Sequence, residues 1–166
     1  YALYQAYFHK GEFDDANRII RRALALNPND YAMLAYFAVG LALRGDLEPA
    51  RAMQAAAMRL VGRAPPWFSV PTMLVDFQSG NYEAVTKWLA DDAHATPGGF
   101  QVFAIAAMAH LGRNDECREI LANLRHEYPD YDVEMAKTLP LWHLNAELSA
   151  DLAAGLTLAG LDIPSL

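Results

Sequence analysis

The sequence contains few of the residues on which several classes of protein depend. Cys117 is the only cysteine among 166 residues, which excludes an intrachain disulfide and a zinc site built from several cysteines. No apolar run approaches the roughly 18 residues that cross a bilayer. The formal net charge is −7, and the only basic cluster is formed by Arg18, Arg21 and Arg22. We therefore expect neither a membrane span nor direct binding of nucleic acid.

Motifs of common catalytic and nucleotide-binding sites are also missing. The sequence has no G-x-x-x-x-G-K-[ST], G-x-G-x-x-G or G-x-S-x-G, and its five histidines form no H-E-x-x-H. His110 and Cys117 could form a base and nucleophile across a helix turn, but a cysteine at a small packing position is typically structural. Neighbouring carboxylates such as Asp14 and Asp15 point about 100° apart on a helix. We expect no enzyme activity, no metal and no cofactor.

Charge is distributed unevenly along the chain. Residues 1–63 hold 8 Lys and Arg against 6 Asp and Glu, whereas residues 64–166 hold 5 against 14. We interpret the second part as a solvated acidic surface. An acidic surface for a basic partner is the alternative.

The sequence does contain a large apolar fraction and an internal repeat. Hydrophobic residues make up 54% of the chain, enough to form the core of one domain. Glycines stand at positions 11, 45, 80 and 112, so the repeat intervals are 34, 35 and 32 residues. Similar residues follow each glycine at matching offsets, namely Phe13, Leu47 and Tyr82, and then Ala16, Ala50, Val85 and Cys117.

These residue types predict a pair of helices in each repeat. A glycine without a Cβ suits the left-handed position that ends the first helix. A small residue lets the two helices approach closely, and Pro28 and Pro129 end the second helix. The pattern predicts helices at about 1–12 and 14–27, 31–44 and 47–62, 67–79 and 82–93, and 99–111 and 114–127.

A repeat of this length with these positions resembles the tetratricopeptide repeat. The resemblance implies an all-α right-handed superhelix of four helix pairs, at 1–30, 31–64, 65–97 and 98–130. The third and fourth copies depart from the family pattern at Val85, Asp92 and Asn114. Because Tyr1 falls inside the first helix of a pair, we expect this single domain to belong to a longer protein.

The last part of the sequence, 131–166, does not repeat and is expected to cap the array. A short helix is predicted from Tyr131 to Thr138, before Pro140. A final helix is predicted with Asn145 as its N-cap and Gly160 at its end, and its apolar stripe consists of Leu144, Leu148, Leu152 and Leu156. A terminal repeat needs such a cover.

This segment carries a second resemblance. The residues Leu139–Leu141 and the stretch from Ala154 to Leu161 resemble the end of a group of bacterial regulators. In those proteins a tetratricopeptide-type array follows a class III adenylate cyclase domain or an OmpR-type winged-helix domain. The resemblance implies a cytoplasmic regulatory module with a role in signal transduction or transcriptional regulation.

Partners of tetratricopeptide arrays usually dock on the concave face. The resemblance implies a groove formed by Gln5, Phe8, His9, Val39, Leu43, Trp67, Val70, Leu74, Phe77, Gln78, Val102 and His110. Trp67 and Phe77 are the expected anchors for a protein or peptide partner, because aromatic residues often dominate binding energy. Three alternatives stay open: self-association into a homodimer, binding of a small ligand, and a groove filled by the chain's own C-terminal segment.

Overall fold

The computed structural model describes residues 2–62, 64–92 and 99–163, and they form an all-helical domain. No strand occurs in these ranges. The helices are α1 (Ala2–His9), α2 (Phe13–Leu26), α3 (Tyr31–Leu43), α4 (Leu47–Leu60), α5 (Val70–Gln78), α6 (Tyr82–Asp92), α7 (Gln101–His110), α8 (Asn114–Glu127), α9 (Tyr131–Thr138) and α10 (Ala146–Ala159), with short 3-10 helices η1 (Pro66–Ser69) and η2 (Leu139–Trp142). None of the described helices is long and apolar enough to cross a bilayer.

The four repeat glycines end the first helix of each pair, as predicted. Gly11, Gly45, Gly80 and Gly112 have φ values of +74°, +87°, +72° and +74°. The N–H of each glycine donates to the carbonyl three residues earlier. The N–H of the residue after the glycine donates to the carbonyl five residues before that residue. This pair of hydrogen bonds is the Schellman motif, which satisfies carbonyls at a helix end. The same local chemistry therefore turns the chain at all four places.

Side-chain caps and a proline set the ends of the last helices. The Asn145 side chain accepts a hydrogen bond from the Leu148 N–H at 3.0 Å, which confirms it as the N-cap of α10. Gly160, with a φ of +86°, ends that helix. The helix α9 has the predicted bounds and is followed by η2, in which Pro140 stands near the first turn. The predicted boundary between the third and fourth helix pairs, at 97 and 98, lies outside the described residues.

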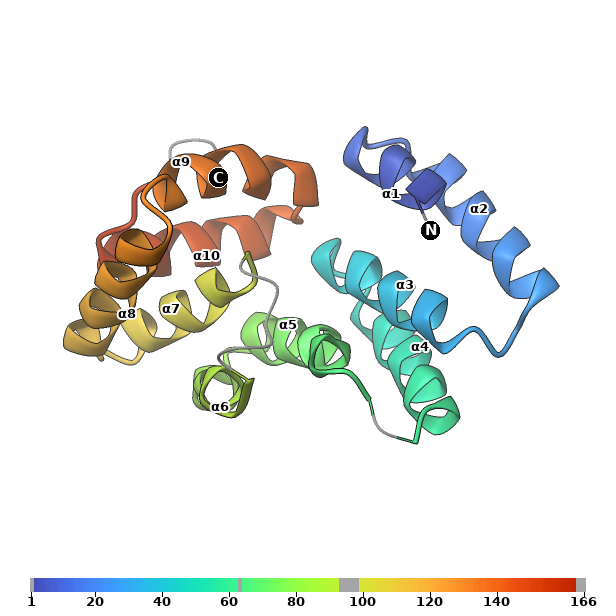
Figure 1. Ribbon diagram of the computed structural model, residues 1–166, viewed down its shortest axis with the longest axis horizontal. Coiled ribbons are helices and arrows are strands. Elements are labelled where there is room, and N and C mark those ends of the chain that lie inside the picture. Colours follow the sequence, from blue (N-terminus) through green and yellow to red (C-terminus); the bar gives the residue numbers. More distant parts are fainter. Residues whose placement is uncertain (1, 63, 93–98, 164–166) are drawn as a thin grey trace.

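The helices follow one another along an arc (Figure 1). In this view α1, α3, α5 and α7 lie on the inner side of the arc, and α2, α4, α6 and α8 lie on the outer side. Successive pairs are in contact through α2 with α3, α3 with α5, and α5 with α7. The segment from Leu139 to Ile163, which we call the tail, packs through α10 on α7 and α8 and reaches α1 through η2.

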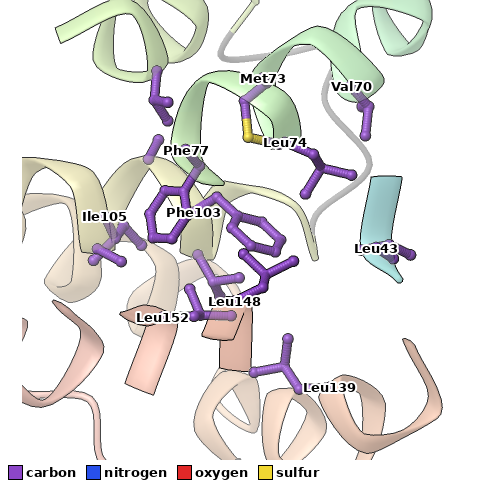
Figure 2. Close-up of a cluster of buried hydrophobic side chains, with 14 of the residues drawn as sticks. Leu43, Val70, Met73, Leu74, Phe77, Phe103, Ile105, Leu139, Leu148 and Leu152 are labelled. Atoms are coloured by element: carbon purple, nitrogen blue, oxygen red, sulfur yellow. The ribbon is translucent and has the colours of Figure 1, made fainter. Parts of the chain in front are cut away.

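Side chains of α5, α7 and α10 form one part of the core (Figure 2). Phe77 of α5 and Phe103 of α7 meet edge to face, with ring centroids 5.2 Å apart. Leu148 and Leu152 of α10 lie below Phe103, and none of these four side chains exceeds 1% exposure. Complete burial of a side chain of this size contributes about 1.5–3 kcal/mol. The predicted leucine stripe of the final helix is therefore the surface that attaches the tail.

The tail also reaches the N-terminal helices and so closes the arc. The Asn145 N–H donates to the Leu43 carbonyl at 3.1 Å, and the Nε2 atom of His143 lies 3.1 Å from the His9 carbonyl oxygen. His143 adopts a left-handed conformation with a φ of 49°. Residues more than 130 positions apart are thus held together on the inner side of the arc.

Candidate functional site

A cavity of about 310 Å³ lies on the inner side of the arc, between the N-terminal helices and the tail. It is assembled from α1, α3, η1, the start of α5, Phe100 and η2. The described lining residues are Tyr4, Gln5, Phe8, His9, Tyr36, Val39, Gly40, Leu43, Trp67, Val70, Phe100 and Trp142. Sequence segments from both ends of the chain therefore contribute to one site.

Two stacked aromatic pairs form part of the cavity lining. Tyr36 and Trp67 stack with ring centroids 4.4 Å apart and an interplanar angle of 23°. Phe100 and Trp142 stack at 4.5 Å and 15°. The two pairs come from different parts of the fold, because the first joins α3 to η1 and the second joins the start of α7 to the tail. The lining thus offers flat aromatic surface from two directions.

Two glycines allow aromatic side chains of the cavity lining to come close to the backbone. A Cβ atom added to Gly40 would collide with the hydroxyl of Tyr4 and lie 3.2 Å from the ring of Phe8. A Cβ atom added to Gly99 would lie 2.7 Å from the indole of Trp142. The shape of the cavity therefore depends on residues without side chains at these two positions.

The cavity is apolar, and its polar groups are few. None of its described lining residues carries a carboxylate, an ammonium or a guanidinium group. His9 is exposed, which places it at the mouth, and its backbone carbonyl is already bonded to His143. Gln5 is half-buried, and its side-chain amide makes no hydrogen bond to another described residue. Gln5 is therefore one polar side chain that an occupant could bond, beside the hydroxyls of Tyr4 and Tyr36 and the exposed His9.

The structure divides the predicted groove residues into three groups. Those that line the cavity are Gln5, Phe8, His9, Val39, Leu43, Trp67 and Val70. Leu74, Phe77 and Val102 are completely buried in the core. Gln78 and His110 are half-buried and bonded to the tail, Gln78 through Asn145 at 3.0 Å and His110 through Asp151 at 3.1 Å. Phe77 is not an accessible anchor in this arrangement, because it is completely buried against Tyr82 of α6 and Phe103 and His110 of α7.

Several cavity residues were not among the predicted groove positions. They are Tyr4, Tyr36, Gly40, Phe100 and Trp142. Tyr4 precedes Phe8 by one helical turn, so the two share a helix face, and this spacing could have indicated Tyr4. Nothing in the repeat pattern indicates Trp142, because it belongs to the tail and reaches the cavity only through the tertiary fold.

A polar cluster outside the cavity attaches α10 to α6 and α7. The Tyr82 hydroxyl donates to the Asp151 carboxylate at 2.9 Å, and the His110 ring stacks on Tyr82 with centroids 4.6 Å apart. Burial, followed by the hydrogen bond and the charge of Asp151, raises the pKa of Tyr82 to about 12. Because its pKa is raised, the Tyr82 phenol keeps its proton at neutral pH and continues to donate to Asp151. This cluster is therefore suited to holding the tail in place.

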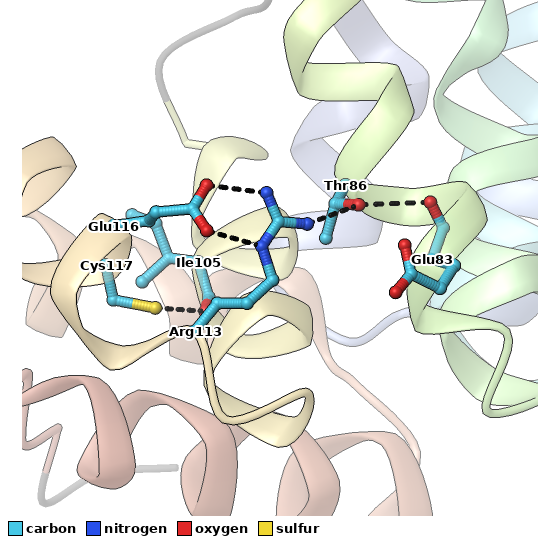
Figure 3. Close-up of polar contacts among 6 residues, drawn as sticks. All are labelled: Glu83, Thr86, Ile105, Arg113, Glu116 and Cys117. Carbon is cyan, nitrogen blue, oxygen red and sulfur yellow. Dashed lines mark hydrogen bonds and ion pairs between the residues drawn. The ribbon is translucent and has the colours of Figure 1, made fainter.

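The predicted partners His110 and Cys117 bond to different groups. The Cys117 thiol is buried and donates to the Ile105 carbonyl oxygen at 3.4 Å (Figure 3). Burial raises the pKa of this thiol, whereas a nucleophilic cysteine needs a lowered one. No group of three or more His, Cys, Asp or Glu side chains in the described ranges could hold a metal ion.

Arg113 connects two neighbouring helix pairs on the same side as Cys117 (Figure 3). Its guanidinium forms two hydrogen bonds with Glu116, at 2.7 and 2.6 Å, and a third with the buried Thr86 hydroxyl at 3.1 Å. The contact with Glu116 raises the pKa of Arg113 and lowers that of Glu116. A bidentate pair of this kind fixes the arginine, so its role is the contact between α6 and α8.

No protein-family model, curated protein or solved structure matches this chain.

Proposed function

We propose that this chain is a non-catalytic regulatory binding module of the tetratricopeptide type and that it works through the aromatic cavity. The observation that carries this proposal is a mostly apolar cavity of about 310 Å³ on the inner side of the helical arc, to which two stacked aromatic pairs contribute. A concave, mostly apolar cavity with a few polar groups is the usual form of a binding site.

The polar groups near the cavity favour binding over catalysis. Catalysis needs a nucleophile, an acid or a base that converge on one point. The polar side chains here are those of Gln5 and His9 and the hydroxyls of Tyr4 and Tyr36, and the buried Cys117 bonds to a carbonyl elsewhere. The arrangement supports recognition of an apolar group.

The position of the tail limits how a partner could bind. A helix or strand laid along the inner side would need the space that α10 fills against α7. The proposed mode is therefore insertion of one apolar group into the cavity, with Trp67 as a principal contact. Self-association remains the alternative function, and light scattering on the chain over a range of concentrations tests it.

The resemblance of the tail to bacterial regulators supports a place beside a class III adenylate cyclase domain or an OmpR-type winged-helix domain. In that setting the module would transmit occupancy of the cavity to the neighbouring domain. Sequencing the gene upstream of the Tyr1 codon tests this part of the proposal, and absence of both domain types would contradict it.

Native mass spectrometry of the chain, isolated from cells without denaturation, tests the binding function. We expect a retained non-covalent mass that is lost in Val39→Trp, which fills the cavity. Leu26→Trp adds the same side chain at a position that is 82% exposed and should keep the mass. Equal retention in both variants, or a wild-type chain without added mass after incubation with cell extract, would contradict the proposal.

A further inference from the structure

We infer that the cavity is a site for one small, neutral, aromatic molecule held near Trp67 and Trp142. This inference rests on the proposed binding function and names the class of ligand. It is carried by the size of the cavity, the geometry of its rings and the absence of charge among its described lining residues.

Size and closure favour a small molecule over a polypeptide segment. The volume of about 310 Å³ lies at the lower end of the range of about 300–1,000 Å³ for sites that take drug-sized ligands. The tail crosses beside the cavity and is held by the bond from Asn145 to Leu43 and by the contact of His143 with His9. An extended chain would have to displace these contacts, whereas a compact ligand would not.

The ring geometry favours an aromatic ligand over an aliphatic one. The Tyr36–Trp67 stack and the Phe100–Trp142 stack both contribute to the lining. A planar ring gains offset-stacked or edge-to-face contacts with such surfaces in addition to the burial of its apolar area. An aliphatic group of the same size gains the burial alone.

The charge of the lining favours a neutral ligand. The described lining residues offer no carboxylate, ammonium or guanidinium group to pair with an ion. Transfer of an unpaired charge from water into such a site is unfavourable. The amide of Gln5 can both donate and accept, so it suits a ligand with one hydroxyl, amide or ring nitrogen.

Two fluorescent probes that share one ring system test the class of ligand. N-phenyl-1-naphthylamine is neutral, and 8-anilinonaphthalene-1-sulfonate carries an added sulfonate. We expect the neutral probe to bind one to one and at least about 10-fold more tightly than the anionic one, because the lining offers the sulfonate no ammonium or guanidinium partner and His9 stands only at the mouth. Comparable affinities for the two probes would overturn the assignment of a neutral ligand.

The three tryptophans locate the bound probe in the unmodified chain. Trp67 and Trp142 line the cavity, whereas Trp88 lies in a separate hollow with Met58 and Lys87. We expect the neutral probe to shift the indole N–H resonances of Trp67 and Trp142 and to leave that of Trp88 unchanged. A shift confined to Trp88, or no shift at saturating probe, would overturn the site.

The variants Val39→Trp and Leu26→Trp separate this inference from the proposed function. Probe binding should be lost in the first and kept in the second, and circular dichroism checks that both are folded. If Val39→Trp does not fold, the resonance shifts in the wild-type chain decide the question. A partner polypeptide that native mass spectrometry finds in the cavity, with no binding of the neutral probe, would overturn the ligand class and leave the binding function standing. Absence of both would overturn both.

Discussion

Gly155 of α10 lies directly against the main chain of Ala106 in α7. A Cβ atom added to Gly155 would lie 2.7 Å from the Ala106 Cβ and 2.8 Å from its carbonyl oxygen. Both residues are buried. Because the opposing atoms include backbone, they cannot move aside as the end of a flexible side chain could. The close approach of the two helices therefore requires glycine at this position.

The variant Gly155→Ala should lower the free energy of unfolding. Overpacking of a filled core typically costs about 1–3 kcal/mol. At an open helical position the same change stabilises by roughly 0.5–1 kcal/mol, because alanine loses less backbone entropy on folding. The sign of the effect in urea unfolding therefore tests the packing of α10 on α7.

Thr157→Ala is the matched control in the same helix. Thr157 is exposed, so its replacement should change the free energy of unfolding by no more than about 0.5 kcal/mol. A Gly155→Ala variant as stable as the wild type would show that the helices are farther apart than described here.

The repeat glycines Gly45 and Gly112 should respond differently to alanine. Both have a positive φ, for which a residue with a Cβ pays roughly 1–2 kcal/mol. A Cβ atom at Gly112 meets nothing within 4 Å, whereas at Gly45 it would lie 2.7 Å from the Nδ2 atom of Asn145. Because Asn145 caps α10, we expect Gly45→Ala to lose more stability than Gly112→Ala in parallel urea titrations. Equal losses would contradict the contact with the tail.

The helices were predictable because their ends carry local chemistry. The glycines at positions 11, 45, 80 and 112 and the cap at Asn145 act through hydrogen bonds within a few residues. The predicted start of the fifth helix at 67 differs slightly, because η1 occupies Pro66–Ser69 before α5 begins at Val70. Such boundaries depend on short-range contacts that a sequence displays directly.

The position of the tail was not predictable in the same way. Apolar periodicity shows that Leu74, Phe77 and Val102 belong to an apolar helix face, but the same pattern describes an open groove and a covered one. These residues are buried through contacts between helices, as Phe77 is by Phe103 and His110 of α7. Trp142 reaches the cavity for the same reason, and the repeat pattern contains no trace of it.

Stability should fall at alkaline pH because the buried Tyr4 and the half-buried Tyr82 keep their protons in the folded state. The pKa of Tyr82 and that of Tyr4 are each raised to about 12 from the ordinary value of 10, mainly by burial. The unfolded chain releases these protons above about pH 10, so the free energy of unfolding decreases from about pH 10 to about pH 12. Urea unfolding at a series of pH values in this window measures the loss.

The variant Asp151→Asn isolates the part that belongs to Tyr82. It removes the negative charge that contributes to the raised pKa of this hydroxyl, so the pKa should move toward 10 and the alkaline loss of stability should shrink. Asp162→Asn removes an exposed carboxylate and serves as the control. An unchanged tyrosinate absorbance titration in Asp151→Asn would contradict the role given to this carboxylate.

The variant His143→Ala should loosen the closure of the arc. The His143 ring meets those of Phe8 and Phe13 edge to face at 6.0 and 5.3 Å, and its Nε2 atom lies 3.1 Å from the His9 carbonyl oxygen. Alanine loses these contacts while the left-handed backbone remains unfavourable. A loss of about 1–2 kcal/mol should speed amide hydrogen exchange in α1 by a factor of about 5–30. Exchange in α8, which lies at the other end of the arc from α1 (Figure 1), should be unaffected. Equal acceleration in α1 and α8 would show global destabilisation, and no acceleration in α1 would show that the tail does not hold it.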